Sequence, residues 1–128
     1  MKTNTLPLQL RRGAISASAD AIAVGPHLDA SSARRFARAV SRLADRRLSH
    51  VIVDMSKTQS VDSSGFGSLI SGLKKLTDAG STPLVVCSNP SVRRLMDFAG
   101  VTRMFRVVDR VSEARRALEL ATAQAIAS

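Results

Sequence analysis

The sequence predicts an α/β domain, with a central mixed sheet of four to five strands packed against about four helices. Two observations predict this fold class. Short runs of apolar residues, typical of buried strands, alternate along the chain with amphipathic segments of helical periodicity. The chain has 128 residues, of which 45% are hydrophobic, and this is enough for one hydrophobic core. We therefore expect a flexible tail at residues 1–7 and a single domain at residues 8–125.

The N-terminal part of this domain is expected to form strands. Between Leu8 and Val24 apolar and polar residues alternate in places, which indicates two short strands arranged as a hairpin. Gly25-Pro26 ends this region. A helix from Ser31 to Arg47 follows, with Ser31 or Ser32 as its cap.

One sector of the 31–47 helix is strongly basic. It holds Arg34, Arg35, Arg38, Arg42 and Arg46. The chain has 19 Lys and Arg against 10 Asp and Glu, a net charge of +9, which by itself favours a nucleic-acid or anionic-lipid partner. Aromatic residues make up only 3% of the chain, however, and no nucleic-acid-binding motif is present. We therefore favour a solvated helix face for these arginines over a nucleic-acid-binding surface.

The middle of the chain predicts a strand, a turn and a helix. His50 to Asp54 contains consecutive apolar residues, as in a strand covered on both faces. Ser63 to Ala79 has helical periodicity, and Gly80 is expected to end that helix. The apolar face of this helix consists of Phe66, Leu69, Ile70, Leu73 and Leu76. We interpret Phe66 as a packing residue rather than a contact residue.

The C-terminal third continues the alternation. Pro83 to Cys87 is predicted as a buried strand and Met104 to Val108 as a short last strand. Between them Asn89 caps a helix with Pro90 at its first position, where the missing N–H costs nothing. Its apolar stripe is expected to be Val92, Leu95, Met96 and Ala99, and Gly100 is expected to end it. A final helix begins near Asp109 or Ser112.

The turn before the 63–79 helix carries two hydroxyls beside a carboxylate. Asp62 is followed by Ser63, Ser64 and Gly65. If Asp62 is the N-cap, Ser64 occupies the second helical position, where backbone N–H groups lack partners within the helix. These side chains either cap the helix only, or they offer a small, unhindered hydroxyl for phosphorylation, whose added charge the positive end of the helix dipole tolerates.

Two stretches of the chain resemble the signature of the STAS domain. They are Asp54-Met55-Ser56 and Val61-Asp62-Ser63-Ser64-Gly65-Phe66-Gly67. Within that family the sequence is most similar to the single-domain anti-sigma-factor antagonists (anti-anti-sigma factors) of bacteria. The downstream match comprises Lys74-Lys75, Gly80, Leu84-Val85-Val86-Cys87, Asn89-Pro90-Ser91-Val92-Arg93-Arg94-Leu95-Met96, Gly100 and Phe105. The resemblance covers roughly residues 8–120 and implies the STAS fold.

The resemblance implies a phosphorylation switch. Similar antagonists are phosphorylated on the second serine of Asp-Ser-Ser-Gly, which corresponds to Ser64, with Ser63 as the fallback site. Asp54, Asp62 and Gly65 would form the environment of this serine; a solvated carboxylate at the strand end is the alternative for Asp54. The unphosphorylated protein would bind an anti-sigma factor that is also a serine kinase and so free a sigma factor. Phosphorylation would end the binding, and a serine phosphatase would restore it.

The expected partner surface extends from this turn along one face of the 63–79 helix. It comprises Asp29, Ser63, Gly67, Ser68, Ser71 and Lys75. Asp29 follows a Gly-Pro-His-Leu-Asp run, one residue longer than the family's Gly-x-Leu-Asp, so capping of the helix entry is the alternative for it. Gly65 and Gly67 lack the further residues of a nucleotide-binding loop, and we expect them to let a partner's backbone approach closely.

Residues that could support catalysis or bind a metal are sparse. His27 and His50 are isolated, and no nucleophile–base pair stands at a recognisable spacing. We therefore expect a protein that is not an enzyme and uses neither metal nor cofactor. Cys87 lies in an apolar run and is expected to be a buried hydrophobic residue. We expect the protein in the cytoplasm, because the sequence has a single cysteine, no secretory signal and no apolar stretch long enough to span a membrane.

Two other functions stay open at this point. The first is a STAS subunit of a lipid-transport ABC complex, docked on the ATPase of that complex, in which Ser64 would be structural. The second is a basic nucleic-acid-binding protein, which the net charge alone suggests.

Overall fold

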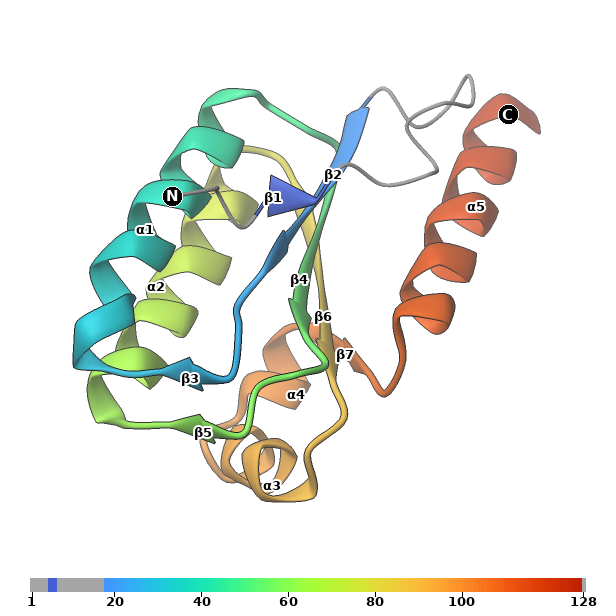
Figure 1. Ribbon diagram of the computed structural model, residues 1–128. Helices are drawn as coiled ribbons and strands as arrows, with labels where there is room; N and C mark the ends of the chain where they lie inside the picture. The colour runs from blue at the N-terminus through green and yellow to red at the C-terminus, as the bar shows by residue number, and fades with distance from the viewer. Residues whose placement is uncertain (1–4, 7–17, 128) are drawn as a thin grey trace.

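The computed structural model describes residues 5–6 and 18–127, and it contains the predicted mixed sheet (Figure 1). The five strands lie in the order β1-β2-β4-β6-β7. They are β1 (Thr5–Leu6), β2 (Ala19–Ala23), β4 (His50–Met55), β6 (Thr82–Cys87) and β7 (Arg106–Val108). The edge strand β1 is antiparallel to β2, and every other neighbouring pair is parallel. A second, two-stranded sheet joins β3 (His27–Leu28) to β5 (Ser60–Val61) in parallel.

Helices cover both faces of the five-stranded sheet. Helices α1 (Ala30–Asp45) and α2 (Ser63–Asp78) lie side by side on one face, and α5 (Val111–Ala127) lies on the other (Figure 1). The short helices α3 (Pro90–Phe98) and α4 (Val101–Met104) lie at the end of the sheet where the parallel strands finish. This arrangement explains the consecutive apolar residues of β4 and β6, since both strands are buried on both faces.

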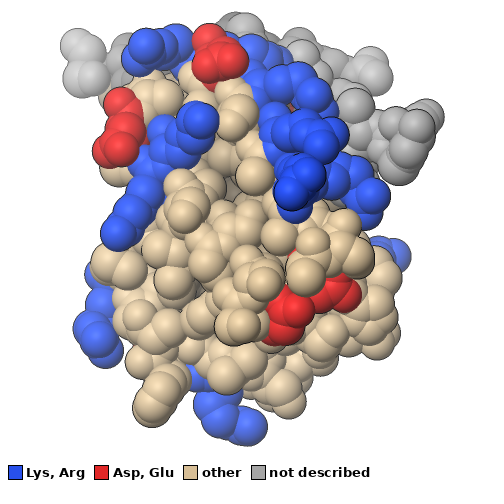
Figure 2. Space-filling view, turned by 90° about the vertical axis from the view of Figure 1, so that its left-hand side faces the viewer, with Lys and Arg blue, Asp and Glu red and all other residues tan. Residues whose placement is uncertain are grey.

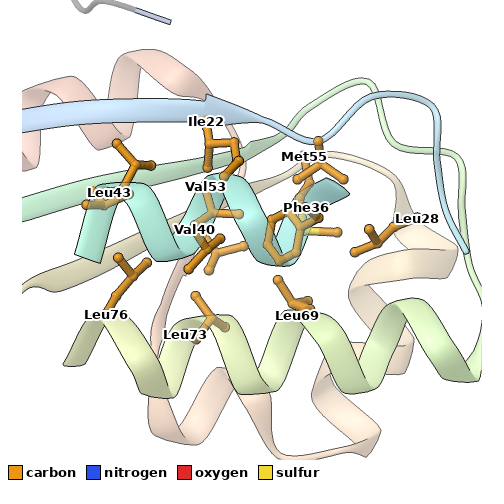
Figure 3. Close-up of a cluster of buried hydrophobic side chains, with 14 of the residues drawn as sticks. Ile22, Leu28, Phe36, Val40, Leu43, Val53, Met55, Leu69, Leu73 and Leu76 are labelled. Carbon is orange, nitrogen blue, oxygen red and sulfur yellow. The ribbon is translucent and has the colours of Figure 1, made fainter. Parts of the chain in front are cut away.

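The larger hydrophobic core lies between the sheet and the α1–α2 pair. Figure 3 shows side chains of both helices pointing toward those of β2 and β4. Its largest fully buried members include Ile22, Leu43, Met55, Leu69 and Leu73. Helices α1 and α2 approach closely at Gly72, where an added Cβ would stand 3.2 Å from a ring carbon of Phe36. A smaller cluster under α5 contains Ala114 and Leu118.

The N-terminal predictions were correct only in part. Of the predicted hairpin, one strand appears as β2, and it pairs in parallel with β4; the other predicted strand falls in residues 7–17, outside the described residues. Thr5–Leu6, which we placed in the tail, forms β1 against β2, whereas residues 1–4 of that tail are outside the described residues. Two residues give no periodicity, so β1 has no detectable sequence pattern.

Two helical predictions need correction. The first helix begins at Ala30, and Asp29 is its N-cap in place of Ser31 or Ser32. Beyond α3, Gly100 has a φ of +83° and turns the chain into α4, an additional short helix that the sequence did not predict. Val92 and Met96 of the expected α3 stripe are buried, but Leu95 is 46% exposed and Ala99 is also exposed. None of the helices in the described part of the chain is both long and apolar enough to span a membrane.

Candidate functional site

The two-stranded sheet brings the first turns of α1 and α2 together. Strand β3 leads directly into Asp29, the N-cap of α1, and β5 leads directly into Asp62, the N-cap of α2. The amide of Asp62 donates to the carbonyl oxygen of Leu28 (3.1 Å). One carboxylate oxygen of Asp62 accepts from the amide of Gly65 (2.8 Å) and the other from the amide of Ala30 (3.2 Å). Asp62 therefore caps its own helix and ties the start of α1 to it.

Asp29 makes a capping box at the start of α1. Its carboxylate accepts from the amides of Ser31 (3.0 Å) and Ser32 (3.2 Å) and from the Ser31 hydroxyl (2.7 Å). In return the Asp29 amide donates to the hydroxyl oxygen of Ser32 (3.0 Å). The structure thus shows Asp29 in a capping role, and its side chain is only half-buried, so part of it also lies at the surface. Ser32 belongs to the cap as the third helical residue.

The capping carboxylate of Asp29 should make the stability of the first turn of α1 sensitive to acid. The hydrogen bond from the Ser31 hydroxyl, together with the two amides, lowers the pKa of Asp29 below its ordinary value of 3.8. Because the folded pKa is depressed, the stabilisation is present above about pH 4 and is lost as the pH falls through the folded pKa. An NMR titration of the Asp29 carboxyl should give a midpoint below that of Asp in an unfolded peptide; an equal or higher midpoint would contradict this. Asp29→Asn should remove that transition and keep the cap.

Ser63 and Ser64 lie exposed on the first turn of α2. They are the first and second helical residues, as predicted from Asp62 as N-cap, and both side chains are exposed. The amides of Gly65 and Phe66 donate to the side chain and carbonyl of Asp62. Neither the amide nor the hydroxyl of Ser64 forms a hydrogen bond with a group in residues 5–6 or 18–127. The hydroxyl is accordingly open to solvent, next to unpaired amides that favour an anion.

Gly65 is required by the chain itself. It is buried, and a Cβ added to it would stand 1.9 Å from the carbonyl oxygen of Leu28. We expected Gly65 and Gly67 to admit a partner's backbone; for Gly65 this is wrong, because the backbone that approaches is that of Leu28 in β3. Gly67 differs, since it is exposed and an added Cβ would meet nothing within 4 Å.

Asp54 is held in the loop after β4. Its carboxylate accepts from the amide of Ser56 (2.9 Å), and its carbonyl oxygen accepts from the amide of Val24 (2.9 Å). The side chain is half-buried, and none of these hydrogen bonds reaches Ser64. The structure therefore shows a loop-closing role for Asp54 and no hydrogen bond between the described residues Asp54 and Ser64.

A shallow groove between α1 and α2 collects most of the expected partner residues. Its volume is about 330 Å³, and it is lined by Ala37, Val40, Ser41, Gly67, Ser68, Ser71, Gly72 and Lys75. Ser71 and Lys75 are exposed, as the sequence pattern predicted. Ser68 instead donates its hydroxyl to the carbonyl of Ala33 (3.1 Å) and so links the two helices. Ala37, Ser41 and Gly72 were not foreseen, because only the packing of α1 on α2 brings them to the groove.

Charge is distributed unevenly over the α1–α2 face. Figure 2 shows Lys and Arg gathered over its upper part, which corresponds to the C-terminal ends of both helices in Figure 1. The centre of the lower part is uncharged apart from one acidic patch, and further Lys and Arg side chains stand at its left and bottom edges. The five arginines of the basic sector are exposed, and one of them, Arg46, pairs with the buried Asp20 at 2.6 Å. The end that carries Ser64 is thus the less basic end of this face.

Solved structures share this fold. An anti-sigma factor antagonist from Mycobacterium paratuberculosis superposes with a TM-score of 0.76 at 18% identity, covering 92% of this chain and 93% of that one. The Bacillus cell fate determinant SpoIIAA, in its phosphorylated form, superposes with a TM-score of 0.62 at 15% identity, covering 82% of this chain and 96% of that one. These similarities establish a common architecture.

Sequence comparison identifies the family. The anti-sigma F factor antagonist of Paenibacillus polymyxa is 29% identical over 75 residues, which are 59% of this chain and 64% of that protein. The match thus spans less than two thirds of the relative's length. The sequence model of the STAS domain matches residues 21–114, which include the end of β2, the two helix caps and the predicted phosphosite. The chain belongs to the STAS domain family.

Proposed function

We propose that this protein is an anti-sigma-factor antagonist whose docking is switched off by phosphorylation of Ser64. In its unphosphorylated form it binds an anti-sigma factor that is also a serine kinase, and a sigma factor is released. The observation that carries the proposal is the exposed Ser64 hydroxyl on the first turn of α2. The STAS family match and the similarity to a named anti-sigma F factor antagonist support it.

The charge change at Ser64 supplies the switch. A phosphoryl group adds about −1.5 to −2 charges at neutral pH. The helix start accommodates it, because the first-turn amides and the positive end of the helix dipole stabilise an anion there. The outer surface, however, changes from a small hydroxyl beside Asp62 to a dianion beside a carboxylate. A partner that docks closely over this turn then loses shape complementarity and is repelled if it presents acidic groups.

The docking surface begins at Ser64 and continues along the α1–α2 groove. We assign to it the residues expected from the sequence: Asp29, Ser63, Gly67, Ser68, Ser71 and Lys75. We assign Asp54, Asp62 and Gly65 to the environment of the phosphosite. Asp62 and Gly65 hold the turn in place through their contacts with Ala30 and Leu28, whereas Asp54 closes the loop after β4. In this proposal the single domain predicted at residues 8–125, extended by strand β1, has no catalysis of its own. The kinase transfers phosphate from ATP, and a serine phosphatase removes it.

Phosphorylation mapping tests the proposal. The protein is incubated with ATP and, one at a time, the anti-sigma-type serine kinases encoded in the same genome, and is then mapped by peptide mass spectrometry. One kinase should add a single phosphoryl group to Ser64. Ser63→Ala should still be modified and Ser64→Ala should not. Modification of Ser63 would move the switch to the fallback site, and no modification of either serine by any kinase would contradict the proposal.

A further inference from the structure

Three large apolar side chains of α3 and α4 are exposed to solvent. Phe98 is 91% exposed, Met104 is 54% exposed and Leu95 is 46% exposed. Leu95 and Phe98 stand three residues apart, so they share one face of α3. Gly100 turns the chain between them and α4, which ends at Met104. We call Leu95, Phe98 and Met104 the α3–α4 patch. Its aromatic and Met side chains are of the types enriched in protein interfaces.

Exposed arginines accompany the patch. Arg94 lies four residues before Phe98, so the two side chains are neighbours on the same face of α3. The guanidinium of Arg103 folds back to the end of α3, where its Nη2 would be 3.0 Å from a Cβ added to Gly100. Both arginines are exposed, whereas the acidic side chain on this stretch of α3 is the single Asp97. The surroundings of the patch are therefore cationic.

The charge decides among the possible occupants. A second copy of this chain would bring the same arginines face to face across a two-fold interface and repel. A membrane-binding surface needs an amphipathic helix of substantial length, whereas α3 has 9 residues and α4 has 4. An amphipathic helix with an acidic flank matches both the apolar side chains and the positive charge of the patch. Its apolar face covers Phe98, and its carboxylates meet Arg94 and Arg103.

The patch lies at the same end of the molecule as Ser64. Helix α3 packs against β5, the strand that leads into Asp62 and the first turn of α2. Figure 1 shows β3, β5, the starts of α1 and α2, and both short helices at this lower end. The surface around Ser64 is made mainly of serine hydroxyls and carboxylates, which rarely supply most of an interface's binding energy. One partner that covers both regions would find its apolar anchor at Phe98.

We infer that the α3–α4 patch binds an acidic amphipathic helix of the same partner protein that docks over Ser64. The inference rests on the proposed function for the identity of that partner. It assigns two tasks to two places: Phe98 and its neighbours hold the partner, and Ser64 decides whether the partner can stay.

Binding of patch variants to the partner tests this inference. The probe is the kinase that modifies Ser64 in the mapping experiment, titrated without ATP so that Ser64 remains unmodified. Leu95→Ser with Phe98→Ser should weaken binding at least about tenfold. Arg94→Glu with Arg103→Glu should weaken it by a similar factor and flatten its salt dependence. Leu120→Ser, which changes a 56% exposed leucine on α5, is the matched control and should bind like the wild type.

The outcomes separate the inference from the proposed function. Full binding by the Leu95/Phe98 variant, with binding still lost in Ser64→Asp, would overturn the inference and leave the switch standing. Weakened binding by that variant, with no effect of Ser64→Asp, would support the patch and contradict the switch. Unchanged melting temperatures confirm that the exposed substitutions leave the fold intact. If phosphatidylglycerol vesicles, or a second copy of the chain, bind through Phe98 while the kinase does not, the assigned occupant is wrong.

Discussion

Ser64→Asp should abolish binding of the anti-sigma partner, whereas Ser64→Ala should bind it like the wild type. The aspartate places a fixed negative charge on the exposed first turn of α2, next to the carboxylate of Asp62. Like charges brought together in an interface cost several kcal/mol, so we expect affinity to fall by about a hundredfold or more. Isothermal titration calorimetry against the purified partner measures the loss directly.

The fold should tolerate this substitution. An acidic residue at the second helical position interacts favourably with the helix dipole, by about 0.3–1 kcal/mol, so the thermal midpoint should stay unchanged or rise slightly. Ser112→Asp is the matched control, because Ser112 is the exposed second residue of α5 on the opposite face of the sheet. It should leave binding unaffected. Equal affinities for Ser64→Asp and Ser64→Ala would contradict the switch.

Gly65→Ala should destabilise the protein by about 3 kcal/mol or more, the upper end of the cost of overpacking. The new Cβ would stand 1.9 Å from the carbonyl oxygen and 2.5 Å from the carbonyl carbon of Leu28. These are backbone atoms, and the same oxygen accepts the amide of Asp62, so the clash cannot be relieved by a rotamer change. Relief requires β3 to move away from the start of α2. Urea unfolding followed by circular dichroism measures the loss.

Gly67→Ala is the matched control for that experiment. It lies two residues further along α2, it is exposed, and an added Cβ would meet no atom within 4 Å. Alanine is favoured over glycine inside a helix by about 0.8–1.0 kcal/mol, so this variant should be as stable as the wild type or slightly more stable. If both variants unfold at the same urea concentration, the close approach of β3 to α2 is wrong.

Helix limits with strong local signals could be predicted from the sequence. Asp62 before two serines, and Asn89 before Pro90, supply caps that depend on a few neighbouring residues, and both helices begin where expected. Asp29 was harder, because two serines follow it and each is also a good cap. The choice of Asp29 depends on the path of β3, which positions its carboxylate over the amides of Ser31 and Ser32.

Contacts between distant segments could not be predicted in the same way. Strands β3 and β5 have two residues each, too short for any periodic pattern, yet they bring Asp62 to Ala30. The exposure of Ser64 followed from its place on the first turn, whereas the burial of Gly65 needed the position of Leu28. Leu95 has the spacing of a core residue in α3 and is nevertheless half-exposed, because the helix lies at the end of the sheet rather than across it.

The most direct test of the switch compares two forms of one preparation. Protein phosphorylated on Ser64 by its kinase is divided, and one half is treated with a serine phosphatase, which is then removed. Binding of both halves to the anti-sigma factor is measured by calorimetry. We predict no measurable binding by the phosphorylated half and full binding by the dephosphorylated half. Equal affinity of the two halves would contradict the account.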